Sequence, residues 1–365
     1  MLMILDSVNF GGAENLIAEL GRYHPAALHV SVASLAPAEQ DRNAMLDRLT
    51  EAGLKPEYLS VNRLLDAAGF FGLVRVLRRA QVDVVHAHLG YAATVVPLAA
   101  RLAGKPVVAT LHLSPQRHAS RGEWLKERLS VRIPARLGRL VLVSQHAFDQ
   151  YARVHGPARA TWRVIPNGVD LDRYTVHSGA SSSERPVWAV VAALRPDKNH
   201  VDLIQAWADV VAVHSGATLL VIGDGPSRGD IEHAVSAAGL AESVQFLGRR
   251  EDVAEILRRV DGVVSASVDE ALPTALIEAG ASGLPVVATD AGGTREIVVD
   301  GITGRLVPMR DVPALTQALL DTIGDPAQAA RYGAAGRAQA QEKYSMAKWV
   351  DRLGKLYKEV MGASS

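Results

Sequence analysis

Short apolar runs alternate with longer helical patterns along most of the chain, and this alternation limits the fold more than any other feature. The runs are nearly uninterrupted and rich in β-branched residues, as expected of parallel strands buried on both faces. One series covers residues 2–8, 29–35, 82–88, 106–112 and 139–144, and a second covers residues 187–194, 217–223, 243–248, 261–267 and 285–290. Helical patterns between them, at residues 13–23, 91–104, 199–214 and 251–260, indicate right-handed crossover connections.

Two such series predict an α/β protein with two Rossmann-like domains, each a doubly wound parallel sheet, facing each other across a cleft. The 365 residues also exceed one ordinary domain. We place an N-terminal domain at residues 1–168 and a C-terminal domain at residues 169–349, joined within the turn-rich residues 165–186. A helix at about residues 350–365 is expected to return to the N-terminal domain. Ligands of such sheets bind at the carboxyl ends of the strands, so we expect the site in the cleft.

Composition excludes several other classes of protein. Lys+Arg and Asp+Glu are equal at 39 each, so no net charge attracts nucleic acid or a membrane surface. The absence of cysteine removes disulfides, thiolate chemistry and cysteine-bound zinc, and it fits a reducing cytoplasm. No run approaches the roughly 18 apolar residues of a spanning helix, and the first residues lack the basic start of a signal peptide. We expect a cytoplasmic protein with no nucleic-acid partner.

Two glutamates flank a proline in the stretch "DEALPTALIEAGASGLPVVATD", residues 269–290. Pro273 suits the first position of a helix, which places Glu270 in the preceding loop and Glu278 inside the helix. The expected N-cap, Leu272, has no side-chain acceptor, so the first backbone N–H groups are left for an anion such as a phosphate. One capping and one surface carboxylate would be the structural alternative, but the uncapped helix start favours a ligand site.

Other loops that follow strands carry cations or glycines. Arg195 and Lys198 suit a diphosphate, although two solvated loop charges would look the same. Gly11 and Gly12 open a helix, where they either let the backbone approach an anion or only complete a tight turn. The glycines that begin at Gly223 lack the spacing of a dinucleotide fingerprint, so we interpret that loop as a strand end lining the cleft.

Two patterns superficially suggest a metal. Asp170 and Asp172 form a D-x-D, but they lie in the expected junction, where a turn is the better interpretation. His86 and His88 share one face of an expected strand, but no third ligand follows nearby, which favours packing or cleft lining. We predict no metal site.

Seven motifs, each weak alone, occur in one order: "GGAE", "TLH", "VIPNGVD", "RPDKNH", "VIGDGP", "FLG" and the E-x7-E of "EALPTALIE" with "GLPVVATDAGGTREIV". Together they resemble the family 4 retaining glycosyltransferases of GT-B fold (glycosyl transferases group 1), over about residues 3–304. The resemblance implies transfer of a sugar from a nucleotide diphosphate sugar to a hydroxyl acceptor with retention of configuration. UDP is favoured as the nucleotide and GDP is possible. The donor is a co-substrate, and the resemblance implies no metal and no cofactor.

The resemblance also implies roles for individual residues. Glu278 would bind the ribose hydroxyls, Glu270 would hold the donor sugar, and His112 would contact that sugar from the N-terminal domain. Lys198 and Arg195 would neutralise the diphosphate. The remaining positions would approach the base, the diphosphate or the reacting end of the donor: Gly11, Gly12, Gly223, Leu247, Gly248, Arg249, Leu272, Pro273 and Thr274.

One departure and three rival functions stay open. The family pattern has an arginine where this chain has Ala193, so whether Arg195 replaces it is undecided. A GT-B-fold sugar-nucleotide epimerase would share the architecture, although E-x7-E argues for transfer. A non-catalytic sugar-nucleotide-binding protein would bind the donor without turnover. A nicotinamide dehydrogenase would need a different glycine spacing. No motif names the acceptor.

The stretch at residues 121–140 combines basic and apolar side chains. Leucine or isoleucine recurs every fourth residue with arginines beside it, and basic residues outnumber the two glutamates. We favour a core-facing helix with a solvated basic side, and Pro134 predicts that it is not one straight helix. The alternative is a weak peripheral contact with the inner face of the membrane, as in some members of the family that this chain resembles.

Overall fold

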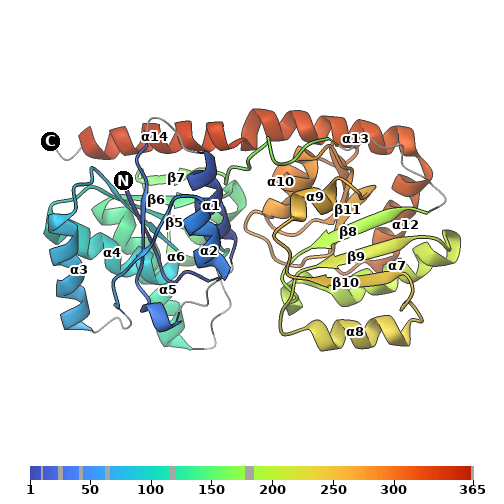
Figure 1. The fold of residues 1–365 in the computed structure, drawn as a ribbon, viewed down its shortest axis with the longest axis horizontal. Coiled ribbons are helices and arrows are strands. Elements are labelled where there is room, and N and C mark those ends of the chain that lie inside the picture. Colours follow the sequence, from blue (N-terminus) through green and yellow to red (C-terminus); the bar gives the residue numbers. More distant parts are fainter. Residues whose placement is uncertain are drawn as a thin grey trace. The chain divides into compact units, whose positions relative to one another are not determined.

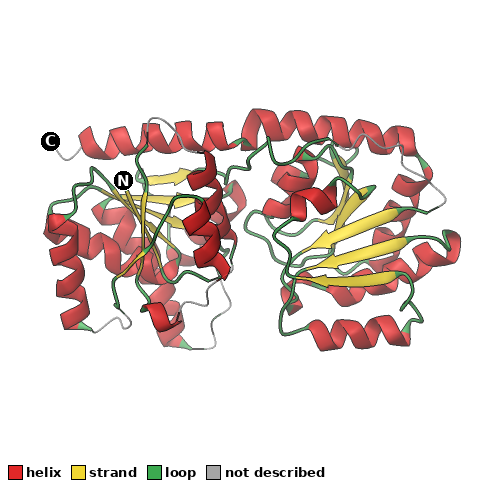
Figure 2. Ribbon diagram, viewed as in Figure 1, coloured by secondary structure: helices red, strands yellow, loops and turns green. Residues whose placement is uncertain are grey.

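The computed structural model describes residues 1–9, 11–23, 28–40, 44–61, 66–115, 118, 120–176 and 185–362 (Figure 1). The chain divides into two compact units, which we call the first unit, Met1–Gly168 with Met346–Ser365, and the second unit, Val169–Ser345. The second division lies at Ser345, four residues before the expected end at 349. Part of the expected junction, residues 177–184, lies outside the described residues. Each unit holds one parallel sheet with helices around it, which confirms the predicted α/β fold class (Figure 2).

The sheet of the first unit has seven strands in the order β3-β2-β1-β4-β5-β6-β7. The paired strands all run parallel. Their bounds are β1 Leu2–Leu5, β2 Ser31–Ser34, β3 Glu57–Tyr58, β4 Val85–His88, β5 Val107–Leu111, β6 Arg139–Leu142 and β7 Trp162–Val164.

Helices cover both faces of this sheet. One face packs against α3 Ala67–Arg79, α4 Gly90–Ala103, α5 Arg121–Leu137 and α6 Gln145–His155. The other packs against α1 Gly12–Tyr23, α2 Ala44–Glu51 and the final helix α14 Met346–Gly362. Side chains of β1 alternate between the two cores: Leu2 and Ile4 enter the first, Met3 and Leu5 the second. This two-sided burial explains the uninterrupted apolar runs in the sequence.

The second unit has a six-stranded parallel sheet in the order β10-β9-β8-β11-β12-β13. Its strands are β8 Val187–Val191, β9 Thr218–Ile222, β10 Val244–Gly248, β11 Gly262–Ser265, β12 Val286–Thr289 and β13 Gly304–Val307. Its α-helices are α7 His200–Val213, α8 Arg228–Ala237, α9 Val253–Leu257, α10 Thr274–Ala281, α11 Thr294–Ile297, α12 Val312–Gly324 and α13 Pro326–Gln339. One core gathers side chains of α7, α8 and α12 around Trp188 and Trp207.

The strands that the sequence pattern did not predict are β3, β7 and β13. All three lie at the edge of a sheet, where a strand has one neighbour and part of it faces solvent. Such strands are short and lack a continuous apolar run, so the pattern passes over them.

One expectation for residues 121–140 needs correction. Residues 121–137 form one continuous helix, α5, that includes Pro134, and β6 begins two residues after the helix ends. That Pro134 makes this helix depart from a straight one stays a prediction. The face of α5 in the core consists of Ser130, Val131, Pro134 and Ala135, and not of the leucine stripe, since Leu125 is 50% exposed. In the part of the chain that the structure describes, no helix is both long and apolar enough to span a bilayer.

Candidate active site

The strand order of the second unit reverses between β8 and β11, and the loops after these two strands bring Lys198 and Glu270 together. Lys198 Nζ lies 2.7 Å from Glu270 Oε1, although 72 residues separate them in the chain. Their side chains are only 12% and 13% exposed. Ligands of doubly wound sheets bind at such a reversal, so the pair occupies the expected ligand position of this sheet.

Neighbouring side chains hold this pair in place. Ser267, which the sequence analysis missed, donates to the same Oε1 of Glu270 at 2.8 Å. Asp197 lies 3.4 Å from Lys198 and binds the guanidinium of Arg195 through both carboxylate oxygens. Burial would raise the pKa of Asp197, but the hydrogen bond from Arg195 and the charge of Lys198 lower it. The Arg195 side chain is 47% exposed, so the two predicted cations differ in surroundings.

Helix α10 begins beside this cluster without a side-chain cap, as the sequence predicted. The N-cap, however, is Pro273 and not Leu272, so the helix starts one residue later than expected. Leu272 is buried, at 7% exposed, and Glu278 is half-buried inside the helix. The backbone N–H of Gly293 donates to the carbonyl of Glu270 at 2.8 Å and so fixes the loop before the helix.

The next part of this site lies at the carboxyl ends of β9 and β10, in the same sheet of the second unit. Gly223 has φ of +139°, and a Cβ there would lie 1.9 Å from the carbonyl oxygen of Ala192, so only glycine fits. Its N–H donates to the carbonyl of Gly248 at 2.8 Å, which joins the two loops. Leu247 and Gly248 end β10, and Arg249 follows it. Tight packing therefore accounts for Gly223 without a ligand.

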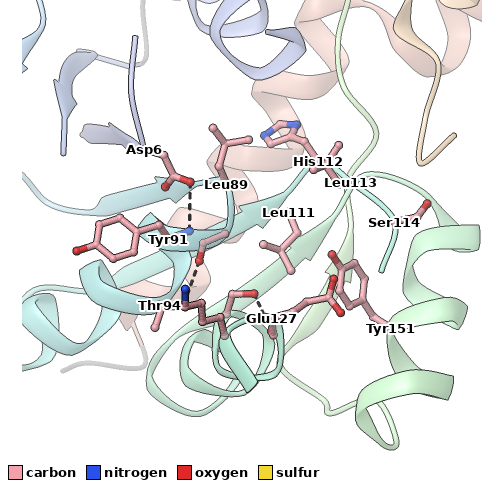
Figure 3. A pocket seen from close by; sticks show the side chains of 13 residues that line it. Asp6, Leu89, Tyr91, Thr94, Leu111, His112, Leu113, Ser114, Glu127 and Tyr151 are labelled. Carbon is pink, nitrogen blue, oxygen red and sulfur yellow. Dashed lines mark hydrogen bonds between the residues drawn. The ribbon is translucent and has the colours of Figure 1, made fainter. Parts of the chain in front are cut away.

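The first unit has a cavity of about 670 Å³ at the corresponding reversal of its own sheet, between β1 and β4 (Figure 3). Its lining is mostly apolar, with a few polar groups. The lining residues are Asp6, Leu89, Gly90, Tyr91, Thr94, Leu111, His112, Leu113, Ser114, Lys126, Glu127, Ser130 and Tyr151. His112, predicted from "TLH", follows β5 and belongs to this wall.

Asp6, which the sequence analysis also missed, caps α4 from the end of β1. Its carboxylate accepts from the N–H groups of Ala92 at 2.6 Å and Tyr91 at 3.2 Å. Burial raises the pKa of Asp6 to about 6, and these two hydrogen bonds only partly oppose the effect. The Tyr91 hydroxyl has no partner among the described residues.

Three histidines form a row, in which the fully buried His86 and His88 lie behind the half-buried His112. His86 hydrogen-bonds Tyr357 of α14 at 2.6 Å and Thr110 at 2.7 Å, and its ring lies 4.2 Å from that of His88. His88 Nδ1 lies 3.0 Å from His112 Nε2. The pKa of His86 falls to about 3 and that of His112 to about 4, chiefly through burial. The rings are therefore neutral near pH 7, and His112 Nδ1 has no partner within the described ranges.

Gly12 begins α1 in the first unit, and Gly11 immediately precedes it. A Cβ on Gly11 would lie against the carboxylate of Glu14, a side chain that can move away. A Cβ on Gly12 would meet nothing within 4 Å. Sterics therefore do not demand glycine at Gly12, and the prediction that this backbone approaches a ligand stays a prediction.

The two apparent metal motifs have other structural roles. Asp170 Oδ1 accepts from the N–H of Asp172 at 3.1 Å, which confirms the predicted turn. His86 and His88 share a strand face, as predicted, and pack in the histidine row. Over the described ranges, no three His, Asp or Glu side chains are arranged to hold a metal ion.

Comparison with known proteins agrees with the two parallel sheets of this fold. The family model "Glycosyltransferase Family 4" matches residues 10–173, and "Glycosyl transferases group 1" matches residues 176–339. A GDP-mannose-dependent alpha-(1-6)-phosphatidylinositol monomannoside mannosyltransferase of Mycolicibacterium smegmatis is 30% identical, over 71% of this chain and 72% of its own. A 2-deoxystreptamine N-acetyl-D-glucosaminyltransferase of Streptomyces fradiae is also 30% identical, over 84% and 82%.

Solved structures show the same fold. HepE of Anabaena matches with a TM-score of 0.83 at 23% identity, over 98% of this chain and 99% of its own. Sucrose-phosphate synthase of Thermosynechococcus elongatus matches with a TM-score of 0.79 at 20% identity, over 99% of both chains. The chain is therefore an enzyme of the glycosyltransferase class with the GT-B fold. It belongs to glycosyltransferase family 4, which the sequence resemblance had indicated and which a nicotinamide dehydrogenase would not match.

Proposed function

We propose that this protein transfers a sugar from a nucleotide diphosphate sugar, most readily a UDP-sugar, to an acceptor hydroxyl with retention of configuration and without a metal. The observation that carries the proposal is the Lys198–Glu270 pair at the strand reversal of the second unit. HepE has been solved with UDP-glucose, and the M. smegmatis relative is GDP-mannose-dependent, so uridine and guanosine are the two bases to test.

The chemistry assigns a task to each group. When the bond between the anomeric carbon and the diphosphate breaks, negative charge develops on the leaving oxygen. Lys198 and the uncapped start of α10 stabilise that charge without a metal ion. Glu270 is oriented through Oε1 by Lys198 and Ser267, and its other oxygen accepts from a sugar hydroxyl. The acceptor hydroxyl attacks from the side of the leaving group and passes its proton to the leaving phosphate.

The cavity of the first unit suits the acceptor. Apolar walls at Leu89, Leu111 and Leu113 favour an acceptor with an apolar part, while Tyr91 and His112 offer hydrogen bonds. His112 can donate from Nδ1 when His88 Nδ1–H donates to His112 Nε2. This tautomer gives His112 a proton to share with a sugar hydroxyl.

A peripheral membrane contact is a further part of this proposal. Leu125 is 50% exposed near the start of α5, beside Trp124, whose ring packs under Arg128 at 4.7 Å. An exposed leucine and a half-buried aromatic ring next to arginines suit a weak contact with anionic lipid at the cytoplasmic face.

The experiment is incubation with a panel of UDP- and GDP-sugars, with and without hydroxyl acceptors. We expect a glycoside whose anomeric configuration, read by NMR, equals that of the donor, and unchanged activity after exhaustive treatment with EDTA. Inverted configuration would overturn the retaining assignment, and activity that returns only with Mg²⁺ or Mn²⁺ would overturn metal independence. A new sugar nucleotide formed without acceptor would identify an epimerase.

A further inference from the structure

Four arginines lie close together on α5 and on the loop after α6: Arg128, Arg132, Arg136 and Arg159. Arg128, Arg132 and Arg136 are spaced four residues apart on α5, which makes them neighbours on the helix surface, and Arg159 lines one cavity together with Arg132. Partial desolvation and the charges of the other three lower the pKa of Arg132. Across the described ranges, none of the four forms an ion pair with an acidic side chain. Like charges without counter-charges raise the local concentration of anions.

Two of these arginines line a cavity of about 330 Å³ in the first unit, separate from the cavity that contains His112. Arg132 and Arg159 share it with two almost fully buried rings, Trp162 at 6% exposed and His155 at 4%. Trp162 Nε1 and His155 Nδ1 have no hydrogen-bond partner in the described part of the chain. The indole N–H can only donate, and leaving a buried donor unpaired is unfavourable.

Structural roles explain only part of this arrangement. Arg132 donates to the backbone carbonyl of His155 at 3.4 Å and so caps the end of α6. The other ring nitrogen of His155, Nε2, lies 2.6 Å from Glu127. Neither contact involves Arg159, an exposed side chain that lines the cavity, or the buried indole N–H of Trp162.

We propose that this cavity binds the phosphate group of a phosphate ester. Arg132 and Arg159 donate from their guanidinium groups to the phosphate oxygens, and the Trp162 ring in the cavity wall lies close to the bound group. The cavity is much larger than one phosphate group, so it also holds part of the esterified alcohol. The site belongs to the first unit, whereas the proposed diphosphate site at Lys198 belongs to the second.

The test follows the indole signal of Trp162 in nitrogen–proton NMR spectra of the full chain, assigned with Trp162→Phe. Millimolar inorganic phosphate should shift this signal saturably. Arg159→Gln, at an exposed position that tolerates substitution, should weaken binding roughly tenfold, the loss expected for one charged hydrogen bond. Arg101→Gln, an exposed arginine on α4, is the matched control and should not change the titration.

Two further experiments separate this site from the donor site and identify the ligand. Lys198→Ala should leave the Trp162 titration unchanged, which separates this site from the donor site. Competition by glycerol 3-phosphate would assign a soluble phosphate ester, and a shift caused by vesicles of phosphatidylcholine with phosphatidylglycerol would assign a lipid headgroup. An indole signal that none of these probes moves, or an Arg159→Gln variant that titrates like the parent protein, would overturn the proposal.

Discussion

The two units carry the same kind of sheet but very different chemistry at the point where the strand order reverses. In the second unit, a lysine and a glutamate of opposite charge meet at 2.7 Å and remain partly accessible. In the first unit, the neutral His112 and the capping carboxylate of Asp6 line a mostly apolar cavity. One reversal is therefore suited to a charged ligand and the other to a largely uncharged one. The shared fold does not decide which chemistry a site performs.

The largest expected effect tests the charged site. Lys198→Ala should lower kcat/KM by about 10²–10³, the usual loss for one donor to the developing charge. Steady-state kinetics with a single donor sugar provide the measurement. In the same experiment, His112→Ala of the first unit should leave the affinity for the nucleoside diphosphate unchanged while turnover falls.

Arg195→Ala is the matched comparison within the second unit. Arg195 is 47% exposed and already bound to Asp197, so we expect a much smaller loss than for Lys198→Ala. Equal losses in the two variants would show that Arg195 leaves Asp197 for the diphosphate. In that case Arg195 would replace the family arginine that is Ala193 here.

The second prediction concerns stability against pH. The folded-state pKa of His86 is about 3 and that of His112 about 4, against about 6.5 for an unfolded histidine. The unfolded chain thus binds protons that the folded chain excludes, so stability is lost as pH falls from 6.5 toward 4. Asp6 opposes this between about pH 4 and 6, because its raised pKa favours the folded state at the lower pH.

As pH falls, the loss of stability caused by the histidines should exceed the gain caused by Asp6, since His88 has a lowered pKa as well. We expect a loss of ~2 kcal/mol per histidine between pH 6.5 and 5, less for the coupled set. In the second unit, His200 has a pKa lowered to about 4 by burial and by Lys198. The second unit should therefore lose less stability than the first as pH falls. Hydrogen exchange corrected for intrinsic rates would measure the stability of each unit separately as a function of pH. His86→Gln should reduce the pH dependence of the first unit's stability. An equal pH dependence of stability in the two units would contradict this difference between them.

The third prediction separates two glutamates of the second unit. Glu278→Gln should weaken nucleoside diphosphate binding roughly tenfold, because an amide accepts ribose hydroxyls less strongly than a carboxylate. Glu270→Gln should keep that affinity and lose turnover, since Glu270 is assigned to the sugar. Titration calorimetry with UDP and GDP would test both, and an unchanged affinity in Glu278→Gln would refute the ribose assignment.

The sequence predicted residues in apolar runs and in ordered motifs better than single polar residues that follow a strand. Apolar runs in the sequence predicted the buried strands. The ordered motifs indicated Lys198 and Glu270, which the structure places in contact at 2.7 Å. Ser267 and Asp6 were missed because a single serine or aspartate after a strand is common, and only tertiary contacts show what it binds. The leucine stripe of α5 had the right spacing for a core face but packs only in part, because neighbouring helices select the buried face.

The smallest expected effect concerns that exposed part of α5. Leu125→Ser should reduce sedimentation with vesicles containing phosphatidylglycerol by roughly threefold at low salt, because only part of one apolar side chain is lost. Ile302→Ser of the second unit, at 59% exposed, removes a similar apolar group and should have no effect. High salt should release both variants and the parent protein, since the arginines of α5 supply the attraction. If Leu125→Ser and Ile302→Ser behave alike, or the parent protein does not sediment at low salt, α5 is an ordinary solvated helix and the acceptor reaches the first unit from solution.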